Sequence, residues 1–257
     1  MVFLGGLHRS GTTLVFRLLR QHPLASGFRD TGVKEDEGQH LQTVYQPARA
    51  FGGEGRFGFR PEAHLIEPEP FAARAQAASL FAQWGRHWDL QRPVLIEKSP
   101  PNLIRMRYLQ ALFPDASFVI VIRHPLEVAL AQRKRERRRS LRAILRHWFV
   151  CHDLFTADAP HVTRLLTLRY EELLADPQPT LDRVLAFVDL PPAEEASAGE
   201  VTPAPSNRNR AQWERFTTTW YSRPYAELLV RNFEDDANRY GYSMRDLDVV
   251  APWALKG

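Results

Sequence analysis

Short, almost uninterrupted apolar runs alternate with helical stretches along this chain, and this alternation limits the folds that it can adopt. The runs cover residues 2–4, 94–96, 118–122 and 165–168. A strand that is apolar on both faces has to be covered on both faces, which is typical of parallel sheets whose connections are helices. The sequence therefore predicts an α/β protein with a central parallel sheet flanked by helices.

The segments between and after these runs predict the covering helices. Helical spacing of apolar residues begins at Thr12 and lasts to about Gln21, where His22-Pro23 stops it. Residues 27–62 are rich in glycine, charge and aromatic rings without clear periodicity, and an irregular stretch of this length is usually functional. Further helices are expected over residues 71–87, 102–113, 126–152, 180–187, 212 onward and 225–240, with a loop over 193–210.

The composition is that of an ordinary globular protein, with 44% hydrophobic and 25% charged residues in a chain of 257. We expect one domain over residues 1–257, with a nucleotide-binding core about 1–190 and a C-terminal helical region about 191–257. No segment approaches the ~20 apolar residues of a membrane span, and no basic leader follows Met1. The single cysteine, Cys151, is expected to be a core residue in a reducing compartment.

The first apolar run leads into a glycine-rich loop and then a helix. Gly6 and Gly11 bound the loop, and Thr12-Thr13 open the helix. Such a turn aims backbone N–H groups and a helix N-terminus at one point, where a phosphate fits. The outline matches a P-loop, but Thr12 replaces the lysine that a nucleotide triphosphatase needs, and the cation is Arg9 inside the loop.

The strongest apolar run ends in Arg123-His124-Pro125. A P-loop kinase places an acid after a corresponding strand, where it helps to hold Mg²⁺. Two arginines without such an acid suit a nucleotide with separated anionic groups. A small-molecule kinase that uses ATP and Mg²⁺ is the alternative, and a non-catalytic binding protein is a further rival.

Four segments, in this order, resemble those of the sulfotransferases that use 3′-phosphoadenosine-5′-phosphosulfate (PAPS). They are GLHRSGTTL (6–14), IEKSPPN (96–102), VIVIRHPLEVALA (119–131) and LRYEELLADP (168–177). The first is similar to the phosphosulfate loop of the tyrosylprotein and bacterial branches. The resemblance implies a P-loop-like domain with helical insertions. It also implies metal-independent transfer of a sulfuryl group from PAPS to a hydroxyl or amine, leaving adenosine 3′,5′-bisphosphate.

The same resemblance implies which residues bind the donor. Arg123 is expected to hold the 3′-phosphate, Tyr170 to lie near the adenine, and Arg208 to close over the nucleotide. The family usually has a serine eight residues after the strand-end arginine, and this chain has Ala131. Either another donor, such as an arginine of residues 208–210, replaces that contact or recognition of the 3′-phosphate is looser. The loop residues implied are His8, Arg9, Ser10, Gly11, Thr12 and Thr13.

Two kinds of group are needed for the transfer itself. Negative charge builds on the leaving 5′-phosphate, and Arg9 and Lys98 are the candidate cations that stabilise it. The acceptor needs a general base within hydrogen-bond reach. Analogy with the tyrosylprotein branch selects Asp30, whereas Glu37 and His40 are candidates on chemistry alone.

The sequence gives less information about the acceptor and about the cellular location of the protein. A bacterial, cytoplasmic enzyme is expected, acting on a small-molecule, carbohydrate or lipid acceptor. The basic run of residues 133–142 is interpreted as a solvated helix face, or as a patch for an anionic acceptor or a peripheral membrane contact. Aromatic residues within 45–59 either line the acceptor pocket or anchor the loop. The net charge of +4 and the lack of a known module argue against nucleic-acid binding.

Overall fold

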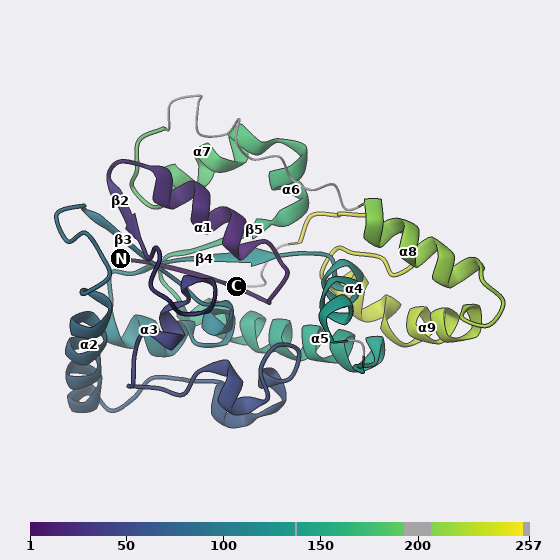
Figure 1. Ribbon diagram of the computed structural model, residues 1–257, viewed down its shortest axis with the longest axis horizontal. Helices are drawn as coiled ribbons and strands as arrows, with labels where there is room; N and C mark the ends of the chain where they lie inside the picture. The colour runs from purple at the N-terminus through teal and green to yellow at the C-terminus, as the bar shows by residue number, and fades with distance from the viewer. Residues whose placement is uncertain (137, 193–206, 254–257) are drawn as a thin grey trace.

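The computed structural model describes residues 1–136, 138–192 and 207–253. Its centre is a five-stranded sheet with the strand order β2-β3-β1-β4-β5 (Figure 1). All neighbouring strands are parallel, so the predicted α/β class with a central parallel sheet is confirmed. The strands are β1 (Val2–Gly6), β2 (Ala25–Gly27), β3 (Val94–Lys98), β4 (Ser117–Ile122) and β5 (Leu165–Arg169).

The middle of the sheet is buried on both faces. Every residue of β1 and β4 is buried, and the rings of Phe3 and Phe118 stack with centroids 5.5 Å apart. Burial on both faces explains why these strands are continuous apolar runs in the sequence. Because all five strands point the same way, their carboxyl ends meet at one edge, where α/β proteins bind ligands.

Helices cover the two faces of this sheet. Figure 1 shows α1, α6 and α7 on one side and α2, α3 and α5 on the other. The irregular segment after β2 consists of short 3-10 turns. The indole N–H of Trp84 holds this segment in place by donating to the Gly38 carbonyl at 2.9 Å. The helices are α1 (Thr12–Gln21), α2 (Pro70–Trp84), α3 (Met106–Leu112), α4 (Pro125–Arg135), α5 (Leu141–Asp158), α6 (Tyr170–Ala175), α7 (Pro177–Phe187), α8 (Asn207–Thr218) and α9 (Arg223–Arg239).

The prediction of one helix over residues 126–152 is wrong. The chain leaves the helix after Arg135, and Ser140 starts the next one by accepting a hydrogen bond from the backbone N–H of Ala143. A serine at this position satisfies an N–H that has no partner inside the helix. The basic run therefore spans a helix end, a turn and a helix start, instead of the face of one helix.

Three other expectations need correction. Residues 102–113 begin as a 3-10 helix, η6 (Pro100–Ile104), because the Asn102 side chain bonds to Glu97 and to the Leu4 carbonyl. The short α6 and β2 were not expected. The loop expected over residues 193–210 ends earlier, since α8 begins at Asn207, and residues 193–206 lie outside the described part.

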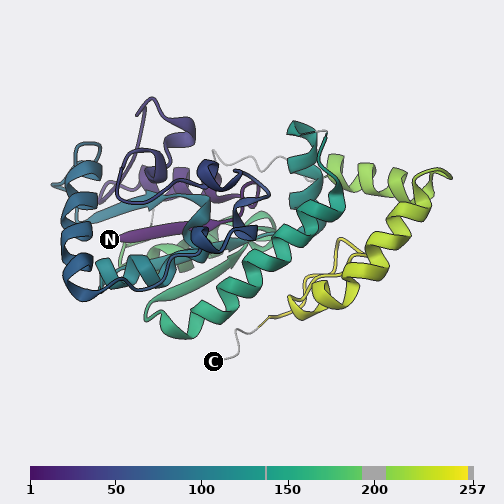
Figure 2. The ribbon, with the colours of Figure 1, turned by 90° about the horizontal axis from the view of Figure 1, so that it is seen from below.

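The C-terminal helices form a hairpin that packs against α4 and α5 (Figure 2). Phe149 of α5 stacks on Phe233 of α9 with centroids 5.5 Å apart, and the Tyr240 hydroxyl donates to Asp153 at 2.6 Å. The expected helical C-terminus is thus present in the described residues. The boundary near residue 190 stays a prediction.

Cys151 lies in the core, as expected, and burial raises the pKa of its thiol. Beside it in α5, burial lowers the pKa of His147 and of His152 to about 3. Burial also lowers the pKa of His124 to about 4; its Nδ1 accepts the Leu126 N–H that begins α4. These rings are neutral at neutral pH. Among the described helices, none is long and apolar enough to cross a membrane.

Replacing His124 by asparagine should flatten the acid dependence of stability. The unfolded chain takes up the imidazole proton near pH 6.5, whereas the folded protein resists it down to about pH 4, so stability is lost as the pH falls through this window. The variant should lose about 1.4 kcal/mol less per pH unit in the free energy of unfolding. Urea denaturation at several pH values measures this slope, with His161→Asn as the exposed control. Parallel slopes for His124→Asn and the wild type would contradict the assignment.

Candidate active site

The glycine-rich loop after β1 wraps around the start of α1. Three residues of the turn, Gly6, Arg9 and Gly11, have left-handed backbone angles. The Ser10 hydroxyl donates to the Leu7 carbonyl at 2.6 Å and closes the turn. A loop closed in this way directs successive backbone N–H groups toward the space in front of the helix, as anion sites do.

A cavity of about 220 Å³ lies in front of this loop, and we call it the donor cavity. Among the residues predicted to bind the donor, five from the loop and α1 line it, whereas Ser10 does not; Arg123 lines it from the end of β4. Ala131, where the family has its serine, also faces this cavity. The five are His8, Arg9, Gly11, Thr12 and Thr13.

Arg123 is held by partners on two sides. Its guanidinium donates to the Arg9 carbonyl at 3.1 Å and to the Glu127 carboxylate at 2.8 Å. It lies over the ring of Tyr170, 4.5 Å from the centroid. That ring also covers Gly11 so closely that a Cβ there would lie 2.2 Å from it. The loop, the strand-end arginine and the tyrosine therefore form one packed unit.

A second cavity, of about 520 Å³, continues from Arg123 and Tyr170 toward the C-terminal part of the chain. Its wall includes the apolar side chains of Leu174, Leu247 and Val250, together with Arg210. Arg210 is ion-paired with Asp248. A partly apolar pocket that shares its arginine with the donor cavity is suited to a nucleoside.

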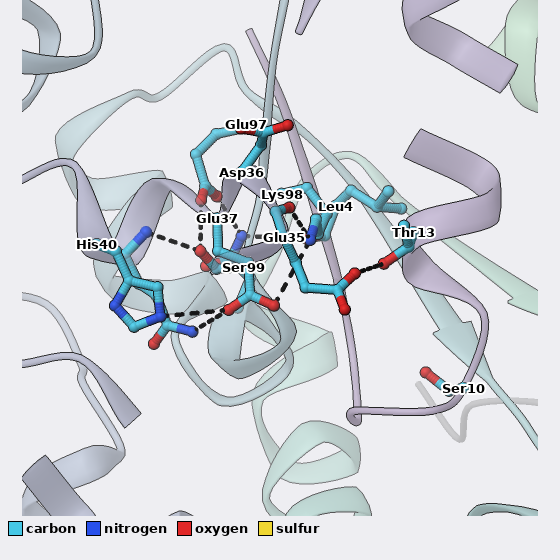
Figure 3. Close-up of polar contacts among 12 residues, drawn as sticks. Leu4, Ser10, Thr13, Glu35, Asp36, Glu37, His40, Glu97, Lys98 and Ser99 are labelled. Atoms are coloured by element: carbon cyan, nitrogen blue, oxygen red, sulfur yellow. Dashed lines mark hydrogen bonds and ion pairs between the residues drawn. The ribbon is translucent and has the colours of Figure 1, made fainter. Parts of the chain in front are cut away.

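Lys98 ends β3 and is completely buried. Its ammonium group donates to the Glu35 carbonyl at 2.7 Å and lies 3.5 Å from Oε1 of Glu37 (Figure 3). Burial lowers the pKa of Lys98, and the nearby carboxylates, Glu37 first, oppose that shift. Lys98 is not among the residues that line the donor cavity. It stands behind Glu35 and Glu37, which do line it.

Glu97 precedes Lys98 in β3 and is also buried. Burial raises the pKa of its carboxyl to about 7, although Ser99 and Asn102 donate to its two oxygens at 2.6 and 2.5 Å. Ser99 in turn accepts the backbone N–H of Gln39 at 2.9 Å. This chain of hydrogen bonds holds the turn that carries Glu37 and His40.

A third cavity, of about 370 Å³, lies beside the donor cavity, and we call it the acceptor cavity. His8, Lys34 and Glu37 line both this cavity and the donor cavity. His40 lines the acceptor cavity but not the donor cavity, and its Nε2 lies 3.7 Å from Oε2 of Glu37. Burial, followed by the nearby cation of Arg49, lowers the pKa of His40.

The guanidinium of Arg9 is partnered by a carboxylate from a distant loop. Its Nε lies 3.3 Å from Oε1 of Glu54, which stands among Gly52, Gly53 and Gly55. All three glycines have positive φ, which few other residues adopt. Glu54, Lys34 and Glu35 line these cavities but were not predicted from the sequence. An acid inside a glycine run was the one available signal for Glu54.

Among the predicted site residues whose side chains are described, Ser10, Lys98 and Asp30 line none of the three cavities. Asp30 is exposed, with a positive φ. Arg208 lies in α8, and its side chain falls outside what the structure describes. Within the described residues, no group of three or more His, Cys, Asp or Glu side chains is arranged to hold a metal ion.

Comparison with known proteins identifies the family of this chain. A model of the sulfotransferase family matches residues 2–195. The chain belongs to this family. Protein-tyrosine sulfotransferase 2 of Gallus gallus is 23% identical over 74% of the chain, and an uncharacterized protein of Aquifex aeolicus is 22% identical over 91%. The chain spans 51% and 32% of the lengths of these curated relatives.

Solved structures agree on the fold. The sulfotransferase domain from the curacin biosynthetic pathway aligns with a TM-score of 0.50 at 16% identity, covering 100% of this chain and 93% of that domain. The P-loop-like sulfotransferase fold is therefore confirmed. At this identity the alignment speaks for the fold alone.

Packing of Tyr170 on Gly11 predicts a specific penalty for a methyl group at this glycine. Gly11→Ala should destabilise the protein more than Gly32→Ala, by about 1–3 kcal/mol in the free energy of unfolding. Both positions have positive φ, but a Cβ at Gly32 would meet nothing within 4 Å. Urea denaturation measures both variants, and Gly11→Ala combined with Tyr170→Ala should recover the extra cost. Equal losses at the two glycines would refute the close contact.

Proposed function

We propose that this protein is a sulfotransferase that moves a sulfuryl group from PAPS to a hydroxyl or amine of a small-molecule, carbohydrate or lipid acceptor. The observation that carries the proposal is the position of Glu37, which lines both the donor cavity and the acceptor cavity. A base between two cavities is what a direct transfer between two bound molecules requires. Membership of the sulfotransferase family supports the same chemistry.

We propose one orientation for the donor in these cavities. The 5′-phosphosulfate belongs at the loop, near the N–H groups at the start of α1 and the Arg9 guanidinium. The 3′-phosphate belongs at Arg123, and the adenosine belongs in the cavity beside Tyr170. Arg210, which lines that cavity, is the arginine placed to replace the contact that Ala131 cannot make.

The reaction is an in-line displacement at sulfur. The acceptor oxygen or nitrogen forms a bond to sulfur while the bond from sulfur to the 5′-phosphate oxygen breaks. Glu37 takes the acceptor proton, and Lys98 holds the carboxylate in place from 3.5 Å behind it. Arg9 and the loop N–H groups stabilise the charge that builds on the departing phosphate. These cations fill the role that Mg²⁺ has in a kinase, so we propose that transfer needs no metal.

Calorimetric titration separates this proposal from the kinase alternative. The protein should bind adenosine 3′,5′-bisphosphate equally well with and without Mg²⁺. Loss of a charge-assisted contact in Arg9→Ala or Arg123→Ala should weaken binding about 10- to 100-fold. Arg86→Ala, an exposed arginine outside the described cavities, is the control. Binding of ATP that depends on Mg²⁺, with no response to the bisphosphate, would overturn the proposal.

Substitution of the three candidate bases tests the role of Glu37. The assay uses the acceptor with which the wild type forms adenosine 3′,5′-bisphosphate from PAPS fastest. With this acceptor, Glu37→Gln should lower kcat about 10²- to 10⁴-fold. Its affinity for the bisphosphate should stay within about threefold of the wild type. His40→Asn and Asp30→Asn should each lower kcat less than about tenfold. A larger loss in either of these two variants than in Glu37→Gln would move the base to that residue.

A further inference from the structure

An arginine-rich cavity lies beside the acceptor cavity, across the glycine-rich turn that carries Glu54. Its volume is about 400 Å³, and Arg56, Arg60 and Arg139 line it. Among the described residues that line this cavity, none is acidic. Arg56 and Arg60 are exposed, and three guanidinium groups around one hollow make it a favourable place for an anion.

These arginines have few partners of their own. No ion pair or hydrogen bond among the described residues uses the side chain of Arg56 or Arg60. Arg139 is about 10% exposed and pairs with Glu136, yet its Nε is buried without a partner. A buried donor of a charged group that lacks an acceptor is costly, so this atom points to a missing ligand.

The cavity is connected to the transfer site through one residue. The backbone carbonyl of Glu54 accepts from Arg139, and its carboxylate faces Arg9 of the phosphate loop. On the other side, Phe59 and Ala143 also line a further cavity that contains Arg142 and Arg146. The cations of the two cavities therefore form one row on either side of Phe59 and Ala143, and Asp236 is the acidic residue that also lines the further cavity.

We propose that this row, which we define as Arg56, Arg60, Arg139, Arg142 and Arg146, binds anionic groups of the acceptor, and that the acceptor is an acidic saccharide. The inference rests on the proposed function. Planar guanidinium forks match carboxylate and sulfate groups bidentately. Among the described residues that line the acceptor cavity, most have polar side chains, and only Val33 and Ala48 are aliphatic. A hydroxyl-rich ring suits such walls, whereas an acyl chain or a steroid needs an apolar pocket.

Binding of defined saccharides to the protein saturated with adenosine 3′,5′-bisphosphate tests the proposal. The probes are two acidic hexasaccharides, one of galacturonate and one derived from heparin, and uncharged maltohexaose of the same length. At least one acidic probe should bind, with affinity that falls as salt rises, while maltohexaose binds at least about tenfold more weakly. The double variant Arg56→Gln/Arg60→Gln should weaken that binding tenfold or more. For a saccharide that the enzyme uses as an acceptor, this double variant should have a higher KM and a nearly unchanged kcat.

Controls separate the possible failures. Arg74→Gln/Arg86→Gln removes two exposed arginines outside the described cavities and should leave saccharide binding within twofold of the wild type. Both double variants should keep the wild-type affinity for adenosine 3′,5′-bisphosphate, which shows that they fold. The proposal fails if neither acidic probe binds, if maltohexaose binds equally well, or if an acidic peptide of alternating Glu and Tyr binds more tightly through the same arginines. If the wild-type protein does not bind the bisphosphate at all, that result contradicts the proposed function instead.

Discussion

A buried ammonium group at the end of β3 determines how the irregular segment folds over the sheet. Lys98 has no exposed surface, and a buried cation is stable only with carboxylates and carbonyls around it. Glu35 and Glu37 supply these groups, so the segment that contains them has to lie across the strand ends. The wall between the donor and acceptor cavities follows from this one requirement. Glu37 is thereby fixed at the boundary without any regular secondary structure.

A second constraint is the close packing of the phosphate loop against α6. Glycine at position 11 lets the Tyr170 ring approach the turn, and the ring in turn supports the Arg123 guanidinium. Tyr170 begins α6 directly after β5, and Arg123 directly follows β4. Adjacent parallel strands therefore deliver the two residues side by side. The cavity beside Arg123 and Tyr170, where we propose that the nucleoside binds, is thus a direct consequence of strand order.

Features that depend on local sequence were predictable. The run into Gly6, the helix from Thr12 and the arginine after β4 all follow from strand, turn and cap patterns, and the structure has each of them. Features that depend on contacts between residues far apart in the sequence were not predictable. Nothing near Asp30 distinguishes it from Glu37, because only the distant Lys98 decides which carboxylate is buried at the site. The break between α4 and α5 was hidden because arginine favours helices, and the Ser140 cap was outweighed by the apolar pattern around it.

The net charge of the chain also does not reveal where its charged residues gather in the structure. A net charge of +4 describes a mildly basic protein, yet the structure distributes its cations unevenly. At or directly behind the donor cavity, three cations each have an acid beside them: Arg9 has Glu54, Lys98 has Glu37, and Arg123 has Glu127, whereas Lys34 has no ion pair among the described residues. These pairs hold the side chains in place before a ligand arrives, which reduces the reorganisation that binding requires. Along the neighbouring cavity, Arg56 and Arg60 have no such partners among the described residues. We propose that the paired cations form a preorganised site for the donor, and that the unpaired arginines form a surface whose counter-charges come from the acceptor.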